Sequence, residues 1–436
     1  MRAISCGSLR RYGMESSANL SAADRDPART NGTPHDRRRL IPATGLREYW
    51  YPGIQAKKVG RGKVVQVRML DRELVFFQGR DGKVAALWSV CPHRGGNLGD
   101  GDVHFDGTVT CPYHAWTFDG AGECVAVLTE GPDSLIPGKV RARHYPTRTL
   151  KGVVFVWMGE SEPAPIEEDV PEEFFEPDSE SMVFVFAQEW PVNWAVALEN
   201  SLDSHVPYVH RNSWNAAVGG MTHYGPRGRR PVLVKNGVGA TPTESVPRPA
   251  QEYYPGLGKW PRSQWRRLWT WAFRLAVRRS RKRTPFQRAP EWGMAHHLPA
   301  MFRTTASTHA YTRVCVPMDA GHSRVTYYYS TRPANFLHRA YIWAQYYLWF
   351  KWHMLVHFSN QDLHPMKNQR WDTPEMLSPN DAELIVWRKI LTQARGLQPA
   401  SGSNGESQGG ENFAHGMERT LGMDSSETVE GLERRA

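Results

Sequence analysis

The sequence predicts a two-domain α+β protein, in which a small all-β domain precedes a larger domain of antiparallel strands and helices. In the first part of the chain, short β-rich runs alternate with turns that contain Gly and Asp, at residues 63–69, 74–78, 84–90 and 152–157. Farther along, strand-like runs at 181–189, 311–316 and 323–330 are segregated from helical patterns at 194–202, 336–358 and 381–395. Such segregation is typical of an α+β domain.

A connector rich in Pro and Glu, residues 163–177, divides the two parts. We therefore place the first domain at residues 45–162 and the second at 163–397. Residues 1–44 lack apolar periodicity and residues 398–436 are rich in Ser, Gly and Glu, so both ends are predicted to be disordered extensions. The N-terminal stretch has no hydrophobic core of a signal peptide, so secretion is not expected.

The last helical pattern has a clear start signal. Ser378 suits the N-cap, Pro379 the first helical position and Asp381 the first turn. The sequence therefore predicts that this helix begins at residues 379–381.

Composition limits the class of protein. Five cysteines in 436 residues argue against a disulfide framework and favour a reducing, cytoplasmic compartment. No uncharged apolar stretch reaches about eighteen residues, so a transmembrane span is not expected. The net charge of +10 is concentrated in one segment without a recognised nucleic-acid motif, so we do not expect nucleic acid as a partner.

The strongest motif in the chain is a pair of Cys–His loops. Cys91 and His93 are separated by one residue, seventeen residues follow, and Cys111 and His114 are then separated by two. Two thiolates and two imidazoles from two tight loops suit a [2Fe–2S] cluster, in which the cysteines bind one iron and the histidines the other. Replacing two thiolates by neutral imidazoles raises the reduction potential relative to an all-cysteine cluster.

A zinc site is the main alternative, because zinc accepts the same four ligands. Zinc fingers place a helix after the second ligand pair, whereas a strand-like run, residues 115–118, follows here. Cys124 lies nearby but not at ligand spacing, and is expected to be a small core residue.

The loop sequences CPHRGG and CPYHAWTFD resemble the Rieske domain of ring-hydroxylating oxygenases. Rieske electron carriers of respiratory complexes typically have one further cysteine in each loop, where this chain has Gly96 and Ala115 or their neighbours. The resemblance therefore implies the terminal oxygenase component of a Rieske non-heme iron oxygenase, with a helix-grip-type catalytic domain. The segment SPNDAELIVWRKIL, residues 378–391, is similar to the carbazole-dioxygenase-like branch, whose oxygenases are homotrimers.

The same resemblance points to a second metal site. His205 and His210 fit the imidazole pair of a 2-His-1-carboxylate triad for mononuclear Fe(II), which leaves positions open for O₂ and solvent. Asp362 is the natural candidate for the distant carboxylate. Residues five apart on an unbroken helix lie about 140° apart, which is poor for sharing a metal. Pro207 is expected to break or kink such a helix between the two histidines.

Asp203 has a separate role by resemblance. In the family an aspartate before the first histidine connects the iron histidine of one subunit to a cluster histidine, here His114, of the next. The family usually has two residues between this aspartate and the first histidine, and this chain has one, Ser204. Asp203 is therefore the expected catalytic bridge, with an altered spacing.

One basic, aromatic segment lies within the second domain, at residues 256–290. Residues 259–288 contain eleven Lys or Arg and no acid, interleaved with aromatic residues that include Trp265, Trp269 and Trp271. The segment suits a peripheral contact with an anionic membrane or an acidic protein. The alternative is a solvated insert whose aromatic face packs on the catalytic domain.

These observations predict an enzyme that hydroxylates an aromatic or polycyclic substrate once or twice with O₂. Electrons would come from NAD(P)H through a ferredoxin or its reductase to the cluster of a homotrimer. The alternative from another class is a Rieske electron-transfer protein that lacks mononuclear iron chemistry.

Overall fold

The computed structural model describes residues 40–202, 205–210, 223–224, 229–242, 248–249, 295–305, 309–369 and 375–397. The predicted tail, most of the predicted N-terminal extension and the basic segment 256–290 lie outside these residues. No helix among the described residues is both long enough and apolar enough to cross a membrane.

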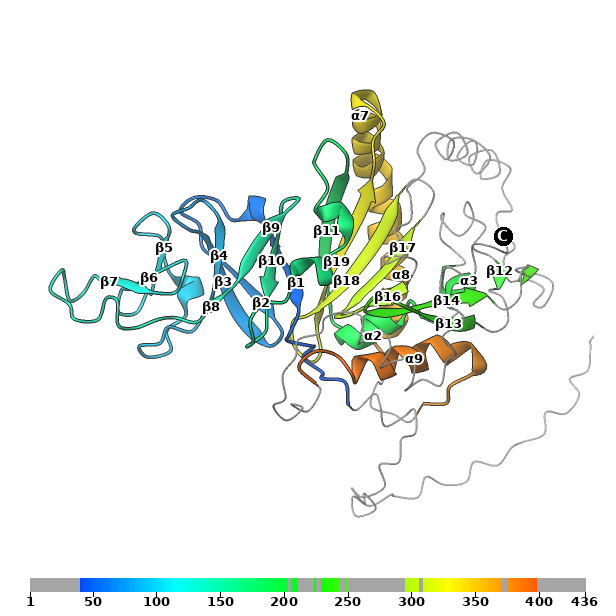
Figure 1. The fold of residues 1–436 in the computed structure, drawn as a ribbon, viewed down its shortest axis with the longest axis horizontal. Helices are drawn as coiled ribbons and strands as arrows, with labels where there is room; N and C mark the ends of the chain where they lie inside the picture. Colours follow the sequence, from blue (N-terminus) through cyan, green and yellow to red (C-terminus); the bar gives the residue numbers. More distant parts are fainter. Residues whose placement is uncertain are drawn as a thin grey trace, which may run out of the picture.

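The N-terminal half is a set of small antiparallel sheets (Figure 1). A four-stranded sheet has the order β2-β3-β4-β8, and two three-stranded sheets have the orders β1-β10-β9 and β5-β6-β7. The strands are β1 (Trp50–Gln55), β2 (Val65–Met69), β3 (Arg72–Gln78), β4 (Val84–Trp88), β5 (Thr108–Thr110), β6 (Trp116–Asp119), β7 (Cys124–Val127), β8 (His144–Tyr145), β9 (Thr147–Leu150) and β10 (Val153–Trp157). The four β-rich runs predicted in this region are thus strands.

Strand β3 joins two hydrophobic cores. Val75 and Phe77 belong to a small core beneath the β5-β6-β7 sheet, whereas Leu74 and Phe76 belong to the large core of the molecule. Because successive side chains of a strand point to opposite faces, one short apolar run supplies both cores. The large core also takes in residues of the C-terminal half, so packing continues across the predicted boundary at residue 162.

The C-terminal half contains a seven-stranded antiparallel sheet of order β11-β19-β18-β17-β16-β14-β13. Its strands are β11 (Met182–Trp190), β13 (Arg229–Val234), β14 (Gly237–Pro242), β16 (Ala295–His297), β17 (Met301–Thr305), β18 (Ala310–Pro317) and β19 (Ser323–Thr331). The short strands β12 (His223–Tyr224) and β15 (Arg248–Pro249) pair with each other. The predicted antiparallel sheet is confirmed.

One long helical segment runs along this sheet (Figure 1). It consists of α7 (Phe336–Gln345), a π-helical segment (Tyr346–Phe358) and α8 (Ser359–Met366). The predicted helix ended at residue 358 and therefore stopped short of α8. The other helices are α2 (Trp194–Glu199), α3 (Val206–Val209) and α9 (Ala382–Leu391).

Strand β19 is buried along its whole length because both faces of the sheet are covered. Tyr329 packs against Phe350 of the π-helical segment, with ring centroids 4.2 Å apart. The neighbouring Tyr328 points the other way and packs on Phe174, 4.8 Å away, which in turn contacts Phe155 of β10. Because successive side chains of β19 point to opposite faces of the sheet, this strand contacts the helical segment on one side and packs toward the N-terminal half on the other.

Two predicted boundaries are informative. The start signal of α9 is confirmed, because Ser378 and Asp381 form a capping box around a short 3-10 turn that leads into the helix. The disordered extension was predicted to end at residue 44, but Ile41 is buried and the carbonyl of Pro42 accepts a hydrogen bond from Trp194. The ordered chain therefore begins a few residues earlier than composition indicated.

A buried ion pair ties the linker to the sheet and gives a stability prediction. Arg303 donates two hydrogen bonds to the carboxylate of Glu173, at 2.6 and 3.0 Å, and both side chains are inaccessible to solvent. Arg303→Met should lower the free energy of unfolding by about 3–5 kcal/mol, because it leaves Glu173 buried without its cation. Chemical denaturation measures the change.

The exposed pair of Arg61 and Asp106 supplies the control. Arg61→Met should leave the free energy of unfolding essentially unchanged, because both charges of this pair are solvated. The double variant Glu173→Leu/Arg303→Met should be more stable than Arg303→Met alone, since no unpaired charge stays buried. Equal costs for Arg303→Met and Arg61→Met would contradict this account.

Candidate functional site

The two Cys–His loops have matching backbone conformations. In the first, the amide of Cys91 donates to the carbonyl of Gly96 at 2.8 Å and the amide of Gly95 donates back to Cys91 at 2.9 Å. In the second, the amide of Cys111 donates to Trp116 at 2.8 Å and the amide of Ala115 donates to Cys111 at 3.0 Å. Gly95 and Ala115 occupy the left-handed region, with φ of 72° and 54°. The two loops are therefore similar tight turns.

The loops face each other, and their cysteines are buried whereas their histidines are more exposed. Both cysteines are buried at the base, whereas His93 is exposed and His114 half-buried at the tip. The imidazole rings of His93 and His114 lie 4.5 Å apart between centroids. Burial raises the pKa of the Cys91 thiol to about 11, so the ionised thiol needs a metal or another cation to be stable there. The arrangement would place a thiolate-bound iron inside and an imidazole-bound iron at the surface.

Two details of these loops bear on the alternatives of a Rieske electron carrier, which has a further cysteine in each loop, and of a zinc site. A Cβ atom at Gly96 would come within 2.9 Å of the Cys111 sulfur, so this position has no room for a side chain. The chain after His114 forms strand β6, as predicted, and not the helix of a zinc finger. Trp116, the first residue of β6, stacks on His93 at 4.5 Å with the rings nearly parallel, which sequence reasoning did not anticipate.

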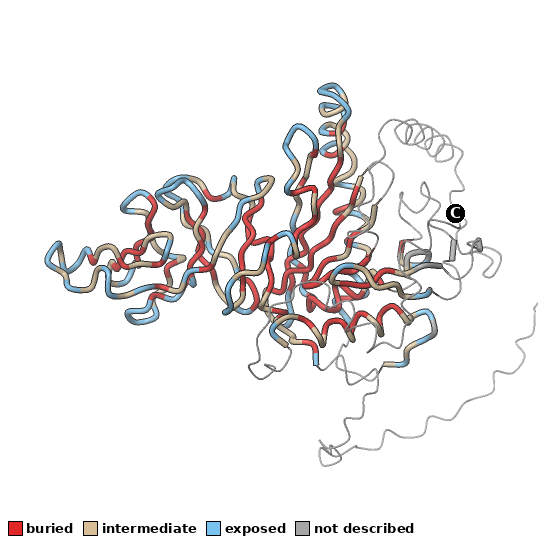
Figure 2. Tube along the Cα trace, viewed as in Figure 1, coloured by how far each residue is buried: buried red, intermediate tan, exposed pale blue. Residues whose placement is uncertain are grey.

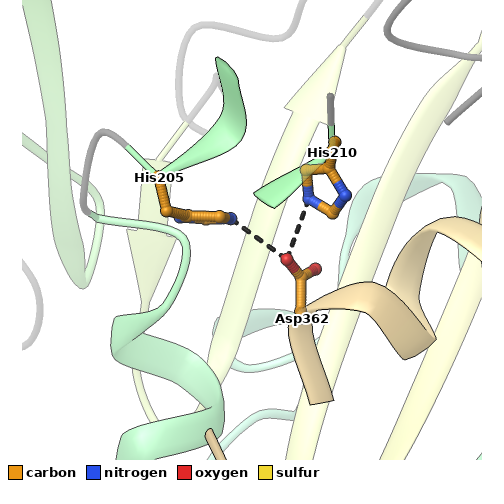
Figure 3. A group of neighbouring side chains, drawn as sticks. All are labelled: His205, His210 and Asp362. Atoms are coloured by element: carbon orange, nitrogen blue, oxygen red, sulfur yellow. Dashed lines mark ion pairs between the residues drawn. The ribbon is translucent and has the colours of Figure 1, made fainter. Parts of the chain in front are cut away.

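The second candidate site brings together the three residues named for a mononuclear metal (Figure 3). His205 Nε2 lies 3.1 Å from Asp362 Oδ1, and His210 Nε2 lies 2.8 Å from the same oxygen. One ligand atom from each residue lies within 4.8 Å of the others. His210 and Asp362 are buried and His205 is mostly buried. Residues far apart in the sequence thus converge on one point.

The helix between the two histidines is shorter than expected. α3 has only four residues, and the carbonyl of His205 accepts hydrogen bonds from the amides of Tyr208 and Val209. Pro207 lies in the first turn, where its missing N–H is not needed, so it does not break the helix between the histidines as predicted. His205 precedes this helix and His210 follows it. The separation of about 140° expected for residues five apart on one helix therefore does not apply to them.

The electrostatics of the three residues fit a cation. His210 Nε2 and Asp362 Oδ1 are buried and form no hydrogen bond within the described residues, although they lie 2.8 Å apart. Burial alone would raise the pKa of the Asp362 carboxyl, but the two imidazoles that face it hold that pKa below its ordinary value. Two imidazole nitrogens and an ionised carboxylate are the donors of a facial triad for Fe(II).

His210 is held by two residues that sequence reasoning missed. Its Nδ1 lies 3.0 Å from Gln361 Oε1, and its ring stacks on Phe358 with centroids 3.5 Å apart. The amide oxygen can only accept, so Nδ1 donates the proton of this hydrogen bond and Nε2 is the ring nitrogen that faces Asp362. Gln361 precedes Asp362 in the chain, but only the tertiary fold brings its amide to His210.

Buried Arg residues support the helix that leads into the site. Arg388 of α9 donates two hydrogen bonds of 2.8 Å to the carboxylate of Glu199, at the end of α2. Arg313 of β18 donates to the carbonyl of Ala197 at 3.0 Å. Glu199 is therefore engaged as a structural carboxylate.

Two further features complete the surroundings. A cavity of about 660 Å³ lies between α3 and α8, and Tyr208, Val209, Gln361 and His364 are among its lining residues. None of the three converging side chains lines it. Asp203, the predicted bridge, lies outside the described residues, as does the basic segment 256–290.

The contact of Gln361 with His210 gives a prediction. Gln361→Leu removes the acceptor and leaves the Nδ1 proton buried without a partner, so metal affinity should fall about 10- to 100-fold. Co(II) titration followed by visible absorbance measures this affinity. Gln361→Glu keeps an acceptor and should bind more tightly than Gln361→Leu. Asn360→Leu, at an exposed neighbouring position, is the control and should bind as the wild type does. Unchanged affinity in Gln361→Leu would refute the role of this amide.

Comparison with known families matches two stretches of the chain. Residues 49–144 match the Rieske [2Fe-2S] domain, and residues 157–234 match the homotrimeric ring hydroxylase family. Over 170 residues the chain is 31% identical to the terminal oxygenase component of carbazole 1,9a-dioxygenase from Metapseudomonas resinovorans. Over 175 residues it is 34% identical to the 3-chlorobenzoate-3,4-dioxygenase oxygenase subunit of Comamonas testosteroni. These alignments cover 39% of this chain and 44% and 40% of the two relatives, so the chain matches less than half the length of each.

Solved structures share the fold over most of the chain. The terminal oxygenase of carbazole 1,9a-dioxygenase from Nocardioides aromaticivorans IC177 matches with a TM-score of 0.62 at 22% identity, over 83% of this chain and 97% of that one. The corresponding oxygenase from Novosphingobium sp. KA1 matches with a TM-score of 0.62 at 23% identity, over 83% and 96%. Residues 49–144 are thus similar to Rieske [2Fe-2S] domains and residues 157–234 to homotrimeric ring hydroxylases, and the chain has the fold of the solved carbazole 1,9a-dioxygenase terminal oxygenases.

Proposed function

We propose that this protein is the terminal oxygenase of a multicomponent Rieske non-heme iron oxygenase. The observation that carries the proposal is the convergence of His205, His210 and Asp362 in a chain that also has a Rieske domain. An electron carrier needs only the cluster, whereas buried ligand atoms held ready for a second metal serve a catalyst. Fe(II) bound by this triad would supply the activation of O₂.

The chain's own residues divide the work between two sites. Cys91, His93, Cys111 and His114 would hold the cluster, with the two imidazoles turned outward to receive electrons. Gln361 and Phe358 orient His210, and the burial of Asp362 limits the access of water to the carboxylate. The proposed domain limits are residues 45–162 for the cluster domain and 163–397 for the catalytic domain.

The partners are proposed from the relatives. Several of the similar solved structures are complexes of a carbazole 1,9a-dioxygenase oxygenase with a ferredoxin, and the matched ring hydroxylase family is homotrimeric. We propose a homotrimer in the cytoplasm that receives electrons from NAD(P)H through a ferredoxin and its reductase. Carbazole and 3-chlorobenzoate, named for the relatives, are aromatic. An aromatic or polycyclic substrate, hydroxylated once or twice, is the proposed substrate class.

Metal content and product formation test the proposal together. The oxygenase should contain about three irons per chain, since the cluster holds two and the triad one. His205→Ala should retain the visible cluster chromophore, lose one iron and form no product. Cys111→Ala should lose the chromophore. Iron analysis, absorbance and ¹⁸O incorporation across an aromatic substrate panel with a generic reductase pair are the measurements. Two irons in the wild type would instead favour the electron-transfer protein.

Asp203 is proposed as the bridge between the iron site of one subunit and His114 of the next. A carboxylate that accepts hydrogen bonds from two metal-bound imidazoles would orient both rings. Glu199, the other acidic residue before His205, is held by Arg388. Asp203→Asn should therefore keep both metals and lower product formation at least about a hundredfold, the upper range for such supporting residues. Single-turnover oxidation of the pre-reduced cluster should slow in parallel. A wild-type rate of cluster oxidation with full product yield would rule out the bridge.

A further inference from the structure

The long helical segment has an apolar surface on the side that the sheet does not cover. Leu337, Tyr341, Trp343, Tyr347, Leu348 and Trp352 are all exposed, and Leu348 is 78% exposed. Leu337 and Tyr341 lie four residues apart in α7, and Leu348 and Trp352 lie four residues apart in the π-helical segment, so the members of each pair are about one helical turn apart. We call the exposed set of six the aromatic face.

The opposite side of the same segment is buried. Tyr346 stacks on Phe184 of β11 at 4.2 Å, and Ile342 lies one turn earlier. The segment is therefore apolar nearly all round, although only the side that carries Tyr346 and Ile342 is buried. Figure 2 shows α7 mostly in the colours of exposed and intermediate residues. A helix that is apolar all round is normally covered on all sides, and a contiguous exposed apolar patch indicates an interaction surface.

The charges on this segment point to the kind of partner. Residues 333–361 contain Arg339 and Lys351 but no Asp or Glu. The Lys351 ammonium lies 5.0 Å from the ring centroid of Trp352 and 5.2 Å from that of Phe186, so its stem runs along aromatic surface. Arg339 donates to the carbonyl of Ser179 at 3.2 Å. The carboxylate of the neighbouring Asp178 is paired with Lys151 at 2.7 Å.

We propose that the aromatic face is a peripheral docking surface for an anionic lipid bilayer. Trp and Tyr, which supply most of the face, favour the boundary between headgroups and acyl chains. Cationic residues without acids favour an anionic surface. The contact is interfacial, since no helix of the described residues can span a bilayer.

Two other occupants fit the charges less well. A second copy docked by the same face would bring two cationic, acid-free surfaces together. The segment 256–290 of this chain carries many Lys and Arg residues and no acid from 259 to 288, so it has the same sign of charge. An anionic lipid surface complements all of these groups. The proposal does not rest on oxygenase activity.

Vesicle flotation of the full chain tests the proposal. The wild type should float with vesicles of phosphatidylcholine and phosphatidylglycerol, and much less with phosphatidylcholine alone. Leu348→Ser/Trp352→Ser should weaken partitioning at least about tenfold, which corresponds to about 1.4 kcal/mol. Phe105→Ser/Leu135→Ser removes two exposed apolar side chains from the N-terminal half and should partition as the wild type does. Equal circular dichroism and cluster absorbance verify that both variants fold.

Four outcomes would overturn the proposal. The first is no flotation of the wild type, and the second is equal flotation with neutral and anionic vesicles. The third is wild-type partitioning of Leu348→Ser/Trp352→Ser, which would place binding elsewhere, as on the segment 256–290. The fourth is a smaller oligomer of the Leu348→Ser/Trp352→Ser variant than of the wild type by light scattering in the absence of lipid, which would make the face a contact between copies.

Discussion

The approach of two imidazoles to one carboxylate oxygen is the interaction on which the C-terminal half depends. His210 Nε2 and Asp362 Oδ1 are buried 2.8 Å apart, and removing these polar atoms from water costs free energy. Other contacts must therefore hold α3 and α8 in place. Phe358 and Gln361 fix His210 from the side of α8, and Arg388 fixes the end of α2 ahead of the site. A metal bound by these atoms would add its binding free energy to the stability of the fold.

The two proposed metal sites place opposite demands on the chain. The cluster loops keep Cys91 and Cys111 buried and turn His93 outward, as suits a centre that exchanges electrons with another protein. The triad is enclosed, as suits a centre that must exclude water. Strand β3 connects the two regions, because its alternating side chains belong to the small core beneath the loops and to the large core shared with the C-terminal half.

Sequence reasoning succeeded where the signal is local. The cluster loops are defined by short spacings, and the start of α9 by Ser378 and Asp381, so tertiary structure was not needed to find them. Asp362 came from a resemblance, since nothing within its own segment distinguishes a ligand from a surface carboxylate. Gln361, Phe358 and the stacking of Trp116 on His93 arise from tertiary contacts that no periodicity encodes. Pro207 was misjudged because the same residue either breaks a helix or begins one, depending on where the helix starts.

The π-helical segment explains how one helical element can serve both the sheet and the triad. Tyr346 and Leu355 are both buried although they are nine residues apart. At about 100° per residue, an α-helix would put them on opposite sides. In a helix with i→i+5 hydrogen bonds each turn holds more residues, so nine residues make about two full turns and the two side chains share a side. From Leu355, Ser359, Asp362 and Met366 follow at α-helical spacing, and all are buried. The wider turns therefore place Asp362 on the same buried side of the helical segment as Tyr346 and Leu355. The residues of the aromatic face remain on the exposed side.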